Sequence, residues 1–150
     1  MSLLRLHVAA FAVAMALATG CGASTKPTLN VLSVHQSPAR RDMVVYVEVV
    51  NPAARPIKLQ KLQYTFASAG TPAGASPAAT GEVELGARLV AAGAAVVVEV
   101  PLPIDALEIA GDNLILAGRL FAEQDRIIRR FDVEAEVATP IERDWDHLAP

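Results

Sequence analysis

The chain has 150 residues, of which 53% are hydrophobic and 19% are charged, a composition typical of one globular domain rather than a disordered chain. The formal net charge of −3 argues against the clustered basic surface that nucleic-acid binding requires, so we expect no nucleic-acid partner. A single cysteine excludes an internal disulfide.

The first twenty residues have the pattern of a secretory signal peptide. Arg5 precedes an apolar run at residues 8–18, which is shorter than the roughly 20 apolar residues needed to span a bilayer. The run ends in small residues, and the segment LATGC at residues 17–21 resembles the lipobox of bacterial lipoproteins. This resemblance implies that residues 1–20 are removed, that Cys21 is acylated, and that residues 21–28 tether the protein to a membrane.

The same region also permits ordinary signal cleavage. The segment ALA at residues 16–18 fits the Ala-x-Ala site of a secreted protein, whose mature form would be soluble with Cys21 as an incidental thiol. The lipobox is favoured because the single cysteine stands where acylation would occur. The residue after the cysteine is Gly22, whereas an Asp at this position retains enterobacterial lipoproteins at the inner membrane. We therefore expect a lipid anchor in the cell envelope, on the periplasmic side of the outer membrane in a Gram-negative cell.

The mature chain alternates apolar and polar residues with a period of two, which predicts β-strands. Turn-forming segments such as Asn51-Pro52 separate these strands. The alternation stops at residues 103–112, where Ile and Leu at helical spacing indicate at most one short helical turn. The predicted strands are residues 29–35, 42–50, 57–67, 81–90, 94–102, 113–123 and 127–137.

Three local features refine this prediction. The apolar parity of the strand at 57–67 changes between Leu59 and Leu62, so we expect a β-bulge near Gln60 or Lys61. Residues 81–90 and 94–102 alternate well and predict the best hairpin of the chain, with Ala87 and Leu89 facing inward. The small-residue segment 68–79 is expected to be a mobile loop. A hairpin connection is favoured there over a ligand-contacting loop.

Seven short strands with one-sided alternation predict an all-β fold. Each sheet would have one apolar face, and two such faces bury each other when they stack about 10 Å apart. We therefore predict a seven-stranded two-sheet sandwich of the fibronectin type III or immunoglobulin-like kind. It would occupy residues 29–140 and be followed by a loose charged tail at 141–150.

Residues 43–70 contain a hydrophobic strand, an Asn-Pro turn, a Pro/Ile/Leu-rich strand and a Tyr-containing segment that ends near Gly. This order resembles the group-two late embryogenesis abundant (LEA) proteins, also called the water-stress-and-hypersensitive-response (WHy) domain. The resemblance covers about residues 29–140, although the connection at 103–112 is shorter than in the family. It implies a fibronectin-like sandwich and an association with desiccation and related stress. The matching residues are Asn51, Pro52, Pro56, Ile57, Leu59, Leu62, Tyr64 and Gly70.

No pattern of catalytic or metal-binding residues emerges from the sequence. His35 and His147 lack a metal-ligand spacing, and no second cysteine is present for zinc. The segment DWDH at residues 144–147 holds residue types common in metal sites, but it lies in the predicted tail, where nothing rigid would hold the ligands. We therefore predict no metal and no cofactor.

The remaining polar candidates are interpreted as structural or solvated. Glu82 and Glu84 are same-face neighbours on one strand, and Glu134 and Glu136 are the same on another, which indicates solvated sheet faces rather than acid/base pairs. Arg129 shares the parity of inward residues, so we expect it at a strand end, with its head group in water. The side chain before Pro52 is expected to cap its turn through the backbone two residues on.

Two functions of different kinds follow from these patterns. The favoured one is a non-catalytic, lipid-anchored envelope protein of the LEA group-two type that shields proteins or the membrane surface when water is scarce. The alternative is an accessory or scaffold lipoprotein that binds an envelope protein through a sheet face or an edge strand. Sandwich folds host many functions, so the fold alone does not choose between them. We do not expect an enzyme.

Overall fold

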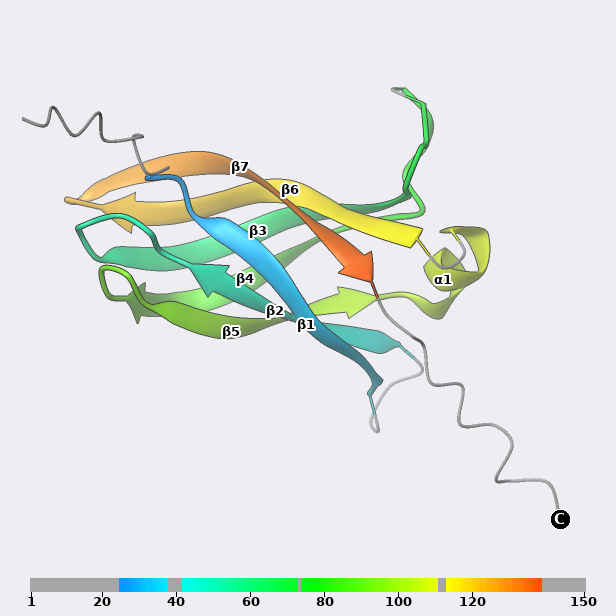
Figure 1. Cartoon of the computed structure of the whole chain (residues 1–150), viewed down its shortest axis with the longest axis horizontal. Helices are drawn as coiled ribbons and strands as arrows, with labels where there is room; N and C mark the ends of the chain where they lie inside the picture. The colour runs from blue at the N-terminus through cyan, green and yellow to red at the C-terminus, as the bar shows by residue number, and fades with distance from the viewer. Residues whose placement is uncertain (1–24, 38–41, 73, 111–112, 139–150) are drawn as a thin grey trace, which may run out of the picture.

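The computed structural model describes residues 25–37, 42–72, 74–110 and 113–138. These residues form two antiparallel sheets stacked face to face and one short helix (Figure 1), so the predicted seven-stranded sandwich is confirmed. The elements are β1 (Thr28–Gln36), β2 (Met43–Val50), β3 (Ile57–Ser68), β4 (Ala79–Val90), β5 (Ala95–Leu102), α1 (Ile104–Ala110), β6 (Asn113–Gln124) and β7 (Ile127–Ala138). Cys21, the signal segment, the 144–147 segment and the tail lie outside the described residues.

One sheet has the strand order β1-β2-β5, and the other has the order β4-β3-β6-β7. The chain changes sheet after β2, after β4 and, through α1, after β5. Helix α1 falls within the segment predicted to hold a helical turn, and its buried Ala106 packs on the core. Each sheet therefore has two edge strands, β1 and β5 in one, β4 and β7 in the other.

Inward-facing side chains of both sheets form one core. On β2, Val45, Val47 and Val49 are fully buried, as the alternation predicts. Side chains of this size contribute about 1.5–3 kcal/mol each on burial, so the two apolar faces hold the layers together. The largest fully buried side chains are Phe66, Ile57, Leu59, Leu62, Leu102, Leu114, Leu116, Leu120, Val45, Val47, Val49 and Val90.

The predicted bulge in β3 is confirmed. Leu59 lies opposite Ala122 of β6 and Lys61 lies opposite Phe121, which leaves Gln60 as the extra residue. The extra residue restores the inward direction of the apolar side chains on both sides of it.

The predicted hairpin between β4 and β5 is wrong. The two strands lie in different sheets, since β4 pairs with β3 and β5 pairs with β2. The inward prediction for Ala87 and Leu89 is also wrong: Ala87 is exposed, Leu89 is 70% exposed and Val90 is buried. The reason is an irregularity in which Leu85, Gly86 and Ala87 stand opposite Gln60 alone. Gly86 and Ala87 have left-handed backbones (φ 63° and 56°), and the parity of the rest of the strand is reversed.

The two ends of the sandwich carry different loops (Figure 1). We call one end the proximal end; it holds the start of β1, the β2–β3 loop, the β4–β5 crossing and the β6–β7 turn. The chain enters this end at Pro27, which is buried. The distal end holds α1, the β3–β4 loop and the end of β7. No helix within the described ranges is long and apolar enough to cross a membrane.

Candidate functional site

Asn51 is the buried polar residue around which the proximal end is organised, with a side chain that is 0% exposed. Its Oδ1 accepts a hydrogen bond from the main-chain N–H of Ala53 at 3.2 Å, the turn cap expected from the sequence. Its Nδ2 lies 2.8 Å from the Arg55 carbonyl oxygen and 3.2 Å from those of Val90 and Ala91. One amide thus joins the β2–β3 loop to the end of β4.

The main chain of Asn51 completes this junction. Its N–H donates to the Ala94 carbonyl at 2.9 Å, and its carbonyl accepts from the N–H of Gly93 at the same distance. These bonds hold the β4–β5 crossing against the end of β2, where Gly93 adopts a left-handed backbone (φ 70°). The crossing is therefore a fixed arch between sheets rather than a hairpin turn.

The other residues of the family resemblance also have positions in the framework. Pro52 and Pro56 are exposed on the β2–β3 loop, and Leu59 is fully buried beside the β3 bulge. Gly70 has a left-handed backbone (φ 85°) in the turn after β3, a conformation that favours glycine. None of these four residues contributes a polar side chain to a site.

Tyr64 lies in the core edge-on to Phe66, with ring centroids 5.5 Å apart and planes at 68°. Its burial raises the pKa of the phenol above the ordinary value, and the nearby charge of Asp42 raises that pKa further. The ring also fills the space beside Gly81, where an added Cβ would lie 2.4 Å from the phenol oxygen. Tyr64 is therefore a packing residue, and it stays neutral at physiological pH.

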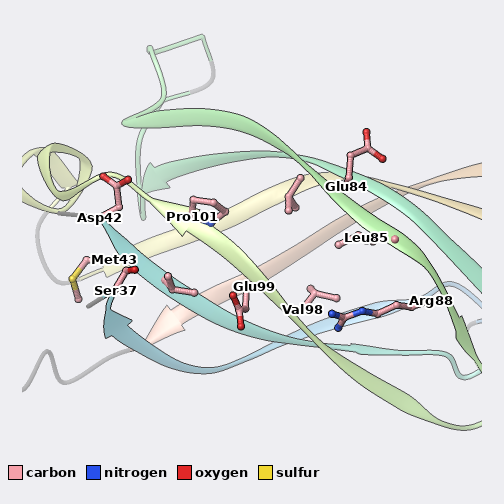
Figure 2. Close-up of a pocket in the computed structure, with 12 residues that line it drawn as sticks. Ser37, Asp42, Met43, Glu84, Leu85, Arg88, Val98, Glu99 and Pro101 are labelled. Atoms are coloured by element: carbon pink, nitrogen blue, oxygen red, sulfur yellow. The ribbon is translucent and has the colours of Figure 1, made fainter. Parts of the chain in front are cut away.

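An open cleft of about 470 Å³ lies where the edge strands β4 and β5 face each other (Figure 2). Arg88 of β4 crosses between the sheets, and its Nη1 donates to the Val97 carbonyl of β5 at 2.8 Å. The cleft exists because the two strands separate into different sheets. The sequence prediction of a hairpin for the same strands could not reveal it.

Acidic side chains dominate the charge of this cleft. Asp42, Glu84 and Glu99 line it together with one basic residue, Arg88. Figure 2 shows the three carboxylates spread along the cleft instead of converging on one point, so they do not form an acid/base pair. The arrangement suits a basic or extended partner better than a small molecule held by converging polar groups.

The carboxylate pairs noted in the sequence lie on exposed faces, as the interpretation of solvated sheet faces predicts. Glu82 accepts hydrogen bonds from Gln63 at 2.8 Å and Lys61 at 3.1 Å. The bond from Gln63, followed by that from Lys61, lowers the pKa of the Glu82 carboxyl below its ordinary value. Within the described ranges, no three His, Cys, Asp or Glu side chains are grouped so as to hold a metal ion.

A mixed apolar and basic surface lies at the proximal end on the β6–β7 turn and the start of β7. We call it the 126–130 patch; it consists of Arg126, Ile127, Ile128, Arg129 and Arg130. The isoleucines are 57% and 64% exposed, and the three arginines are also exposed. Arg129 lies near the strand end, as expected. The patch was not predicted from the sequence, although two adjacent isoleucines and two adjacent arginines interrupt the alternation there.

No protein-family model and no curated protein matches the chain. Among solved structures, a protein described as ApaA from Bordetella pertussis matches with a TM-score of 0.50 and 14% identity, over 77% of this chain and 94% of that one. AT1g01470 from Arabidopsis thaliana matches with a TM-score of 0.49 and 20% identity, over 79% of this chain and 85% of that one. At2g46140.1, described as a late embryogenesis abundant protein, matches with a TM-score of 0.46 and 19% identity, over 79% of this chain and 74% of that one. These likenesses concern the fold.

Proposed function

We propose that the chain is a non-catalytic protein of the cell envelope, anchored by lipid on Cys21, that protects neighbouring proteins or the membrane surface under water stress. The observation that carries the proposal is the order of residues 43–70, which resembles the LEA group-two domain. Asn51, which belongs to that order, is buried and joins two loops. The role we propose for this segment is therefore to build a stable framework.

The anchor can be tested separately from the protective activity. Cys21→Ala removes the thiol that acylation requires, so the variant should leave the membrane fraction, while Ser24→Ala should stay in it. Metabolic labelling with a fatty acid should mark the parent protein and Ser24→Ala but not Cys21→Ala. Unchanged membrane retention of Cys21→Ala would contradict the anchor, and a parent protein that is soluble and carries no label would favour ordinary signal cleavage.

The protective activity calls for a drying assay. A reporter enzyme is dried and rehydrated with the purified mature protein or with an inert protein of equal mass, and its recovered activity is compared. The proposal expects higher recovery with the mature protein. Equal recovery in the two samples would reject stress protection and leave the scaffold function.

The acidic cleft between β4 and β5 favours this second function, an accessory lipoprotein that binds a protein partner. Edge strands have main-chain groups on one side that a partner strand can use. Charge reversal at Glu84 and Glu99, which line the cleft, should abolish capture of a stoichiometric partner from solubilised membranes. Reversal of the exposed Glu134 and Glu136 on β7 is the control. Equal capture by both variants would exclude the cleft as the binding site.

A further inference from the structure

We infer that the 126–130 patch is a contact surface for anionic phospholipid, which holds the proximal end of the sandwich against the membrane. The inference rests on the proposed lipid anchor and adds to it an orientation of the sandwich on the membrane. Ile127 and Ile128 would enter the boundary between head groups and acyl chains, and the arginines would meet lipid phosphates.

Charge gives the first argument. None of Arg126, Arg129 and Arg130 makes an ion pair with a residue that the structure describes. The nearest carboxylate in the turn, Asp125, is already paired with Arg55. The three arginines outnumber Glu123, the carboxylate that lies opposite Ile128 on β6. The patch is therefore locally basic on a chain whose formal net charge is −3, and such a patch complements an anionic surface rather than a neutral one.

The exposed isoleucines give the second argument. Both are more than half exposed, whereas Ile57 is 1% exposed and Ile104 and Ile115 are half-buried. Because they are consecutive in β7, Ile127 and Ile128 point to opposite faces of the strand. With the flanking arginines they surround the tip of the hairpin, where apolar atoms can leave water and cations can meet phosphates at a membrane interface.

Chain length gives the third argument. Only five residues separate Cys21 from Pro27, where the chain is already buried at the proximal end. Even fully extended, such a segment spans roughly 20 Å. An acylated Cys21 would therefore keep the proximal end close to the lipid head groups and give the patch a high effective concentration at the surface. Figure 1 shows the start of β1 at the same end as the β6–β7 turn.

The turn itself is held in one conformation. Asp125 and Arg126 both have left-handed backbones (φ 53° and 67°), as in a two-residue type I′ turn between paired strands. Gln124 and Ile127 close the β6–β7 pairing on either side of it. The patch is thus presented on a formed hairpin, so binding would require little ordering of the backbone.

A fluorescence experiment on the full acylated protein tests this inference. A tryptophan replaces Ile128 in a Trp145→Phe background, and the protein is reconstituted into vesicles that contain brominated phosphatidylcholine with or without phosphatidylglycerol. We expect at least a twofold loss of fluorescence with phosphatidylglycerol. A reporter at Ser76 in the distal β3–β4 loop should stay unquenched.

The charge requirement is tested with matched variants. Replacement of Arg126, Arg129 and Arg130 by Gln should remove most of the quenching of the reporter at position 128. The same loss of charge at Arg88 and Arg119, which lie away from the turn, should leave the quenching unchanged. Quenching that is equal without phosphatidylglycerol, or that survives the patch substitutions, would overturn recognition of anionic lipid.

Vesicle flotation separates this inference from the anchor on which it rests. Protein that floats with an unquenched reporter keeps the anchor and overturns the docking. Protein that floats with neither vesicle type overturns both. Cys21→Ala protein that still floats with phosphatidylglycerol and is quenched would support docking without the anchor.

Discussion

The side chain of Asn51 connects segments that are distant in the chain, since its amide bonds the carbonyl of Val90, 39 residues away. Asn51→Ala would leave the buried carbonyl of Val90 and the part-buried carbonyl of Ala91 without this donor. An unsatisfied buried polar group costs about 1–3 kcal/mol, so we expect a loss of roughly 3 kcal/mol in the free energy of unfolding, measured by urea denaturation. Asn30→Ala, which removes an exposed bond to Glu48, should change stability by less than about 0.5 kcal/mol.

The donor role of the Asn51 amide can also be tested through the pH dependence of stability in the variant Asn51→Asp. The new carboxylate would face carbonyl oxygens, which raises its pKa in the folded state. A raised pKa favours the protonated form on folding, so this variant should regain stability as pH falls through the folded-state value, while Asn51→Ala should show no such gain. Parallel pH dependence of the two variants would contradict the donor role of the amide.

Gly118 is constrained by close contact with the main chain of the neighbouring strand β3. A Cβ at this position would lie 2.3 Å from the carbonyl oxygen of Gln63 on β3, so Gly118→Ala must push β6 away from β3. Overpacking of this kind costs about 2 kcal/mol, and thermal denaturation should detect the loss. Gln63→Ala should restore nothing, since the clash is with its backbone; a clear rescue would refute this reading of the contact.

At the scale of the element, the cross-strand contacts of β3 and β4 set the pKa of Glu82. Gln63→Ala or Lys61→Met should each raise that pKa toward its ordinary value of 4.5, because each removes a hydrogen bond to the charged form. Carboxyl-carbon NMR titration measures the change. Lys58→Met is the control, since its strand partner on β4 is Leu89 and not Glu82, and an equal rise in this variant would contradict the local cause.

The sign of the corresponding stability effect follows from linkage. The folded-state pKa of Glu82 is lowered, so the charged carboxylate favours the fold above the ordinary pKa, and this contribution disappears as pH falls through the folded-state value. The group is fully exposed to solvent, where screening keeps such contributions small. The NMR titration is therefore the more sensitive measurement.

Elements that obey strict alternation could be predicted from the sequence, and those with local backbone exceptions could not. On β2, every second residue from Val45 to Val49 is buried as expected. On β4, the left-handed Gly86 and Ala87 reverse the parity, and β-strand alternation gives no warning of an alanine in that conformation. Alternation also does not specify which strand pairs with which, so the β4–β5 crossing was predicted as a hairpin.

The candidate sites, too, could be predicted only where they depend on residues that are close in the sequence. The turn-capping role of Asn51 could be predicted because the bond to Ala53 is local in sequence. Its reach to β4, and the cleft between β4 and β5, depend on tertiary pairing that no local pattern encodes. The arginine at position 129 was noticed as an exception, but its neighbours join it into a surface only once the β6–β7 turn is formed.

For the whole molecule, an open sandwich must protect four strand edges from association with other chains. On β1, an irregularity at Leu32 interrupts the pairing with β2, and on β4 the bulge at Gly86 interrupts the edge. Charged residues line β7. On β5 the protection is thinner, because Glu99 and Pro101 interrupt an otherwise continuous series of valines.

This arrangement predicts that Glu99→Val converts β5 into an adhesive edge. The change would leave the uncharged run AVVVVVPL at an edge whose Val97 is already 41% exposed, and such segments associate by edge-to-edge pairing. We expect concentration-dependent association beyond the state of the parent protein, measured by size exclusion with light scattering. Glu48→Val removes the same charge from β2, whose main chain is paired on both sides, and should not associate. If both variants associate equally, loss of charge rather than an open edge controls solubility.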